Sequence, residues 1–278
     1  MKSYLNTNFN YDDDQLVSLY DELPLWAAPF GLKLLDQIKI KRNITALDIG
    51  FGAGFPLLEL AMRLGKSSLV YGIDPWKGAV RRTLQKIEFY GISNVELIEG
   101  GAEVIPLANE SIDLITSNNG INNVQDQDKV LNECFRVLKQ GGQFVQTMNL
   151  DATMIEFYQV LEKVLYHHEL VDCLKNLKDQ IYTKRRPLEE FIKHLSSKGF
   201  KITKVIHDQF NYKFADGSTM LNHYFIRLAF MDGWKSIVPE EYKEIIFSEV
   251  ENAMNKKAEN GEEFQLSVPF VVIDCTKE

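Results

Sequence analysis

Between residues 44 and 150, short apolar runs alternate with longer amphipathic segments, and this alternation restricts the fold more than any other feature of the chain. The apolar runs are ITALDIG, SLVYGIDP, VELIEG, SIDLITSN and QFVQTMNL, and segments of helical periodicity separate most of them. Strands that are almost continuously apolar are buried on both faces, and helices of 10 to 15 residues between them form crossover connections. The pattern predicts a doubly wound, Rossmann-like α/β fold.

The regions on either side of this core read mainly as helices. Amphipathic helices are expected over Asp14–Leu23 and from Pro24 to about Ile38, and a later one is expected to run from Asp128 to a glycine cap at Gly141-Gly142. After Leu150, helices are expected over 152–182, from Pro187, over 218–233 and over 239–261. Strands are expected over 201–214 and 264–277, which gives a mostly parallel sheet of seven strands with helical lid insertions.

Composition limits the class of protein. The net charge of −8 argues against a nucleic-acid or anionic-membrane partner, and the one dense basic run, Lys184-Arg185-Arg186, is expected to be a solvated helix end. Three scattered cysteines give no disulfide framework, and five histidines show no metal spacing. The start of the chain has no signal-peptide core, and no apolar run is long enough to span a membrane. A cytoplasmic protein without a metal is therefore expected.

The stretch LDIGFGAG brings backbone close to a ligand. Gly50, Gly52 and Gly54 occupy alternate positions after a strand, and Asp48 precedes them. The dinucleotide fingerprint is G-x-G-x-x-G, and here the third position of that register is Phe55. A carboxylate beside this turn would repel a pyrophosphate, whereas it suits a ligand whose nearby end is positive.

A second acidic residue ends the next strand. Asp74 lies 20 residues after Gly54, where a carboxylate can accept hydrogen bonds from both hydroxyls of a ribose. The ligand is thus expected to be an adenosine derivative with a positive group and no essential phosphate. S-adenosylmethionine fits this description, although Asp74 could also simply cap the following helix.

At these residues the sequence resembles the class I S-adenosylmethionine-dependent methyltransferases. LDIGFGAG and VYGIDP are similar to their first two motifs, and VELIEGGAEVIPLANESIDLITSNNGINNV is similar to the third and fourth. VLNECFRVLKQGGQFV resembles the segment that follows in the branch containing quinone-biosynthesis C-methyltransferases. The similarity covers about Ile44 to Leu150.

The resemblance implies a set of cofactor-binding residues. The methionine part would be held by Asp48 and the three glycines, the ribose by Asp74, and the adenine by Pro75 or Trp76 together with Ala102 and Glu103. Asn118 would face the methionine head or the reaction centre. The family usually has an acid that accepts the adenine amino hydrogen where this chain has Gly101, so Glu103 or a water is expected to replace it.

Candidates for the methyl acceptor's site are weaker. Tyr20, Trp26, Asn119 and His223 are predicted to contact it, although each could be a packing or loop residue. Two insertions, about 151–186 and 213–262, are expected to select a small or medium organic acceptor. We predict a helical cap over 1–40, the cofactor-binding core over 41–150, and lid insertions with the last strands over 151–278.

Methyl transfer is a direct displacement and needs alignment more than a nucleophile on the protein. The sequence therefore predicts a methyltransferase that converts S-adenosylmethionine to S-adenosylhomocysteine, and it identifies no catalytic residue. Two alternatives remain open: a non-catalytic sensor or scaffold that binds the same ligand, and an NAD-dependent oxidoreductase. The acceptor atom and the oligomeric state are not predicted.

Overall fold

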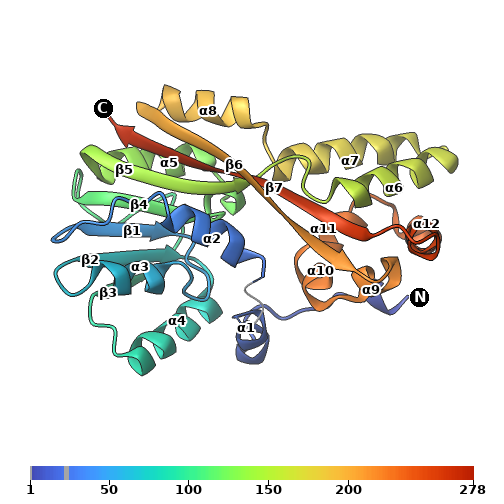
Figure 1. The fold of residues 1–278 in the computed structure, drawn as a ribbon, viewed down its shortest axis with the longest axis horizontal. Helices are drawn as coiled ribbons and strands as arrows, with labels where there is room; N and C mark the ends of the chain where they lie inside the picture. Colours follow the sequence, from blue (N-terminus) through green and yellow to red (C-terminus); the bar gives the residue numbers. More distant parts are fainter. Residues whose placement is uncertain (1, 22–24) are drawn as a thin grey trace. The chain divides into compact units, whose positions relative to one another are not determined.

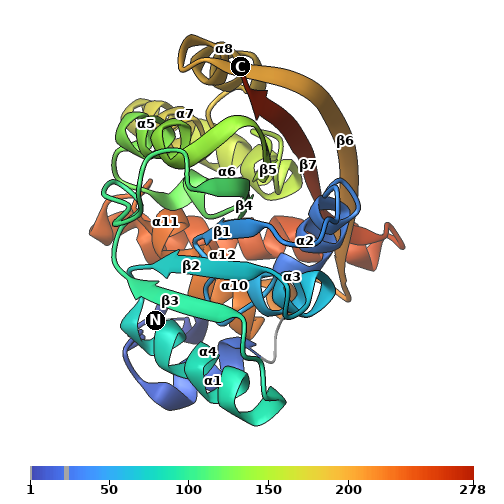
Figure 2. The ribbon, with the colours of Figure 1, turned by 90° about the vertical axis from the view of Figure 1, so that its left-hand side faces the viewer.

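A computed structural model of the chain describes residues 2–21 and 25–278. Its centre is a seven-stranded sheet of order β3-β2-β1-β4-β5-β7-β6, which Figures 1 and 2 show from two directions. The strands are β1 (Thr45–Ile49), β2 (Leu69–Asp74), β3 (Val95–Glu99), β4 (Ile112–Asn118), β5 (Leu138–Asn149), β6 (Phe200–Phe214) and β7 (Phe264–Lys277). The first five pair in parallel and β7 pairs antiparallel with β5, which confirms the predicted fold class.

The chain forms two compact units. The sheet unit comprises Asn10–Asn149, Leu188–Asp208 and Phe270–Glu278, and the helical unit comprises the described residues of Met1–Phe9, Leu150–Pro187 and Gln209–Pro269. β6 and β7 contribute residues to both. The units follow packing and not chain order, and the predicted segment boundaries at residues 40 and 150 stay predictions.

Helices of the sheet unit bury apolar side chains within this unit. They are α1 (Asp14–Asp21), α2 (Ala27–Leu35), α3 (Leu57–Leu64), α4 (Lys77–Tyr90), α5 (Gln127–Val137) and α8 (Leu188–Ser197), with a 3₁₀ turn over Ile121–Asn123. Gly91 ends α4 with φ 64° and ψ 34°, so this predicted glycine cap is confirmed. The predicted start of the second helix at Pro24, and the predicted end of the first at Leu23, lie outside the described residues.

The predicted helix end at Gly141-Gly142 is wrong. α5 ends at Val137, because the buried Leu138 is extended and already pairs with Ile112 of β4. The next paired residues are Leu114 and Gln143, so residues 139–142 bulge out of the ladder opposite a single residue. Gly141 supplies the positive φ of 73° that this bulge requires.

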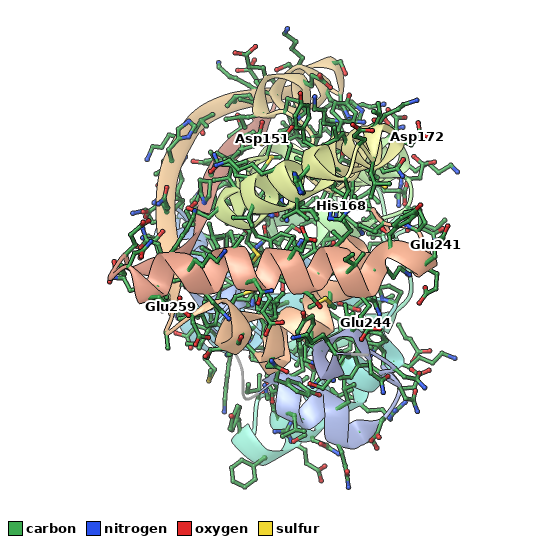
Figure 3. All side chains as sticks on the ribbon, turned by 90° about the vertical axis from the view of Figure 1, so that its right-hand side faces the viewer. Asp151, His168, Asp172, Glu241, Glu244 and Glu259 are labelled. Carbon is green, nitrogen blue, oxygen red and sulfur yellow. The ribbon has the colours of Figure 1, made fainter. Side chains whose placement is uncertain are left out.

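The helices of the helical unit lie along the chain between β5 and β6 and between β6 and β7. They are α6 (Ile155–His167), α7 (Val171–Lys184), α9 (Gly217–Asn222), α10 (Tyr224–Ala229), α11 (Met231–Lys235) and α12 (Glu240–Glu259). Figure 3 shows α12 crossing this unit from Glu241 to Glu259, where it packs on α6. The core is aromatic: Trp234 stacks on Phe157 with ring centroids 3.7 Å apart.

Two predicted helices of this unit are interrupted. Glu169, with φ 56°, separates α6 from α7, and the extended backbone of His223 separates α9 from α10. Buried apolar side chains continue on both sides of each break, so the hydrophobic periodicity of the sequence does not reveal it. None of the helices in residues 2–21 and 25–278 has the length and apolar character that crossing a membrane requires.

Candidate functional site

All three glycines of the loop after β1 have a positive φ, and two of them also leave no room for a side chain. Gly50 has φ 74°, and a Cβ there would lie 2.6 Å from the Cα of Gly120. Gly54 has φ 106°, and a Cβ there would lie 3.0 Å from Leu58. Gly52, with φ 52°, would meet nothing within 4 Å, so its backbone faces open space. The turn is therefore tightly packed on two sides and open at Gly52.

Asp74, at the end of β2, fixes this loop. Its Oδ2 accepts a hydrogen bond from the backbone N–H of Gly52 at 2.8 Å, and its Oδ1 accepts one from Trp76 at 2.8 Å. Burial raises the pKa of the Asp74 carboxyl, and these two bonds oppose that shift by stabilising the ionised form. Each carboxylate oxygen keeps a further lone pair for a ligand.

A cavity of about 680 Å³ opens at the carboxyl ends of the strands, in the size range of small-molecule sites. It brings together most of the predicted cofactor residues from separate loops. Its lining comprises Ile49, Gly50, Ile73, Asp74, Pro75, Trp76, Gly101, Ala102, Glu103, Gly120, Asn123, Val124, Gln125, Asp126 and Lys129.

A smaller cavity of about 170 Å³ adjoins it, because Gly50, Gly120 and Asn123 line both. Its other lining residues are Tyr20, Asp21, Trp26, Ala27, Phe51, Gly52, Ala53, Phe55, Asn118 and Asn119. We name the two spaces the large cavity and the small cavity. The predicted residues Gly52, Asn118, Asn119, Tyr20 and Trp26 thus gather around the small one.

Asp48 is completely buried and, like Gly54, it lines neither cavity. Its Oδ1 accepts a hydrogen bond from Thr116 at 2.6 Å, whereas Oδ2 has no partner among the described residues. Burial raises the pKa of this carboxyl to about 7, and the nearby charge of Asp74 adds to the shift. Its predicted contact with the methionine part stays a prediction.

The asparagine pair after β4 is held by the protein itself. Asn118 donates from Nδ2 to the carbonyl of Ala27 and accepts from Thr147, both at 3.0 Å, so it ties α2 to the sheet. Asn119 adopts φ 60°, and its buried Nδ2 has no partner among the described residues. Asn119 therefore keeps a donor unused at the small cavity.

Glu103 occupies the space that a side chain at residue 101 would fill. A Cβ on Gly101 would lie 2.5 Å from Glu103 Oε2. The other carboxylate oxygen, Oε1, accepts hydrogen bonds from the backbone N–H groups of Gln125 at 3.2 Å and Asp126 at 3.4 Å. Gly101 thus leaves space for the carboxylate of Glu103, which lies two residues later in the chain.

α1 brings Tyr20 and Asp21 to the small cavity. The Tyr20 ring lies edge-on to Trp76 with centroids 5.5 Å apart, and burial, with the charge of Asp74, raises the pKa of its hydroxyl. Asp21 forms ion pairs with Arg82 and Lys86 of α4. His223, the remaining predicted acceptor-site residue, lies in the helical unit, and its role stays a prediction.

Several lining residues were not predicted as site residues. Gly120 is the most constrained, since a Cβ there would lie 2.2 Å from the carbonyl oxygen of Ile49. The sequence signal that could have identified Gly120 is its position directly after the asparagine pair at the end of β4. Phe51 and Phe55, which follow Gly50 and Gly54 in the loop, also line the small cavity. Among the described residues, no cluster of histidine, cysteine and acidic side chains could hold a metal ion.

Comparisons with known proteins agree with this architecture. A demethylmenaquinone methyltransferase of Bacillus velezensis is 32% identical over 150 residues, which are 54% of this chain and 63% of that protein. The chain thus spans less than two thirds of this curated relative. The structure of YcgJ from Bacillus subtilis aligns with a TM-score of 0.57 and 20% identity over 90% of this chain and 98% of that one.

The [4+2]-cyclase SpnF aligns with a TM-score of 0.54 and 14% identity over 90% of this chain and 80% of that one. At these identities the structural likeness shows the fold alone. The family comparison covers more of the chain than the curated relative does, because residues 40–244 match the family described as a methyltransferase domain. The chain belongs to this methyltransferase domain family.

Proposed function

We propose that this protein transfers the methyl group of S-adenosylmethionine to a small organic acceptor and releases S-adenosylhomocysteine. The observation that carries this proposal is the large cavity, which unites Gly50, Asp74 and the Glu103 carboxylate at the strand ends. The open backbone at Gly52 lines the adjoining small cavity and donates to Asp74. Family membership supports the same activity.

The residues present suit this cofactor. The free lone pairs of Asp74 would accept the ribose hydroxyls, and Trp76 with Pro75 would cover the adenine, as both line the large cavity. Glu103 Oε2 would accept a hydrogen from the adenine amino group. Gly50, Gly52 and Gly54 would carry the methionine part, with the unpartnered Oδ2 of Asp48 supplying negative charge nearby.

The reaction requires little acid–base chemistry from the protein. The bound cofactor supplies a methyl group that is already activated by its sulfonium. Tyr20 stays protonated because its pKa is raised, and Asp21 is held by ion pairs with Arg82 and Lys86. The two ionisable side chains of the small cavity are therefore a neutral hydroxyl donor and a paired carboxylate. These residues would orient the acceptor and exclude water, which are the main requirements of a direct displacement.

The acceptor is inferred to enter the small cavity. Trp26, Phe55 and Tyr20 offer aromatic faces there, while Asn119 keeps an unused donor for an oxygen atom. An aromatic ring with an oxygen substituent matches this lining. The name of the Bacillus velezensis relative gives a quinone, demethylmenaquinone, as the acceptor of that protein.

Calorimetric titration tests the cofactor assignment. Wild-type protein is expected to bind S-adenosylmethionine and S-adenosylhomocysteine and not NAD, and Asp74→Ala should weaken both by roughly tenfold to a hundredfold, since it removes hydrogen bonds to a charged group. Asp36→Ala, an exposed residue after α2, is the matched control and should bind as wild type does.

Binding of NAD alone would overturn the proposal in favour of an oxidoreductase. Binding of the adenosyl ligands without methyl transfer to any aromatic acceptor in a radiolabel assay would favour the sensor or scaffold. If Asp74→Ala and wild type bind the adenosyl ligands equally well, Asp74 does not contribute to the cofactor site.

A further inference from the structure

The basic run Lys184-Arg185-Arg186 begins at the last residue of α7 in the helical unit, and it is not the solvated helix end that its sequence predicts. Lys184 is exposed, whereas Arg185 is only 4% exposed. The guanidinium of Arg185 therefore carries its charge inside the protein. Since arginine does not lose its proton in proteins, this charge cannot be removed by titration.

Two cationic side chains are buried in the part of the chain that the structure describes, and their surroundings differ. Lys277 is compensated: its Nζ lies 3.2 Å from Glu110 and donates to two backbone carbonyl oxygens at 2.8 and 2.9 Å. Arg185 has one polar partner, the neutral hydroxyl of Tyr158, at 3.3 Å from Nη1. No carboxylate of the described residues forms an ion pair with it.

A network of hydrogen bonds holds this arginine in place. The Tyr158 hydroxyl donates to Gln180 at 2.9 Å and accepts from Trp234 Nε1 at 3.2 Å, in addition to accepting from Arg185. The guanidinium carbon lies 5.6 Å from the centre of the Tyr158 ring. Both lone pairs of the hydroxyl are thus in use, and the orientation of Nη1 is fixed.

The opposite edge of the guanidinium is free. Nε is buried and has no hydrogen-bond partner among the described residues. Nε and Nη2 carry N–H groups that are parallel within the guanidinium plane. Together they form one of the two edges that bind the paired oxygens of a carboxylate or phosphate. A buried, permanently charged group with an unused bidentate edge is costly unless an anion completes it.

We propose that Arg185 is the charged centre of an anion-binding site in the helical unit, and that its ligand is an oxyanion, either a carboxylate or a phosphate. The ligand would accept two hydrogen bonds from Nε and Nη2, while Tyr158 holds Nη1. This inference does not depend on the proposed methyl transfer.

A purely structural role makes a different prediction. The carbonyl end of α7 and the face of Tyr158 both stabilise a cation, and neither supplies an acceptor to Nε. A structural arginine would change protein stability without making it depend on oxyanions. An arginine that binds an oxyanion makes protein stability depend on the oxyanion concentration, because a ligand that binds only the folded state raises the melting temperature.

The test measures melting temperature and binding heat for the full-length protein with inorganic phosphate and with benzoate, at constant ionic strength set by chloride. At least one of the two should stabilise and bind wild type, and Arg185→Met should lose about tenfold or more in affinity for it. Lys184→Met removes the same charge from the exposed neighbour and should bind as wild type does. S-adenosylhomocysteine binding, measured in parallel, reports separately on the proposed function.

Phosphate binding alone would identify a phosphate group, and benzoate binding alone a carboxylate. Should Arg185→Met fail to fold, Arg185→Lys keeps the charge without the two-nitrogen edge, and about tenfold weaker binding is then expected. The proposal is overturned if neither anion binds wild type, or if the arginine variants bind it equally well.

Discussion

Asp48 links the protonation of one buried side chain to the stability of the fold. Its pKa in the folded protein, about 7, lies above its ordinary value of 3.8, mainly because the carboxyl is buried. A raised carboxyl pKa stabilises the fold most fully below pH 4, and this contribution is lost as the pH rises towards 7. Asp48→Asn should therefore remove up to about 4 kcal/mol of pH dependence in the free energy of unfolding between pH 4 and 7, which denaturant titrations at several pH values measure.

The same carboxyl tests the predicted contact with a positive ligand. A cation near Asp48 favours the ionised form, so the affinity for S-adenosylmethionine should rise from pH 6 to pH 8 in wild type and stay flat in Asp48→Asn. The contact would be contradicted if the affinity for S-adenosylmethionine did not change with pH in either protein. If the pH dependence of the free energy of unfolding still disappeared in Asp48→Asn, Asp48 would be a structural residue only.

Variants of Glu103 test whether its carboxylate replaces the acid that the resembling family usually has at the position of Gly101. S-inosylhomocysteine has an oxygen in place of the adenine amino group, so wild type should prefer S-adenosylhomocysteine by roughly tenfold, and Glu103→Ala should lose this preference. Gly101→Asp combined with Glu103→Ala should restore it, since the new side chain enters the vacated space. An unchanged ratio in Glu103→Ala would assign the adenine amino group to another partner.

At the scale of elements, ion pairs connect α1 to α4, and these pairs differ in how far their carboxylates are exposed to solvent. The Asp21 side chain is 13% exposed and pairs with Arg82 and Lys86, while Lys86 also donates to the carbonyl oxygen of Ala53 in the glycine loop at 2.8 Å. Asp21→Ala leaves two half-buried cations without their carboxylate. We expect a loss of about 1–3 kcal/mol in the free energy of unfolding and weaker S-adenosylhomocysteine binding, because Tyr20 loses its support.

Asp14→Ala is the matched control on the same helix. Asp14 pairs with Arg81, but its side chain is 72% exposed, so solvent screens the pair. Denaturant unfolding and calorimetry should show little change for Asp14→Ala. Equal effects of the two variants would contradict a specific role for Asp21.

At the scale of the whole molecule, the parallel core depends on a strand from the far end of the chain. β7 pairs with β5 from Asn149↔Phe270 to Gln143↔Thr276, and Phe270 packs on Phe30 of α2 with ring centroids 4.7 Å apart. A fragment of residues 1–150 would expose the apolar edge of β5. We expect it to aggregate or lack a cooperative thermal transition by circular dichroism, and a monomeric fragment that unfolds cooperatively would contradict this.

The sequence by itself determined the sheet, most of its helices and the gathering of the glycine loop, Asp74 and Glu103 at one edge. Hydrophobic periodicity and strand-end motifs act over a few residues, so they can be read along the chain. It could not predict that Asp48 is buried, that Leu138 ends a helix by pairing with Ile112, or that Arg185 is enclosed while Lys184 is exposed. Those outcomes depend on what distant segments place around each residue, and only the tertiary structure decides that.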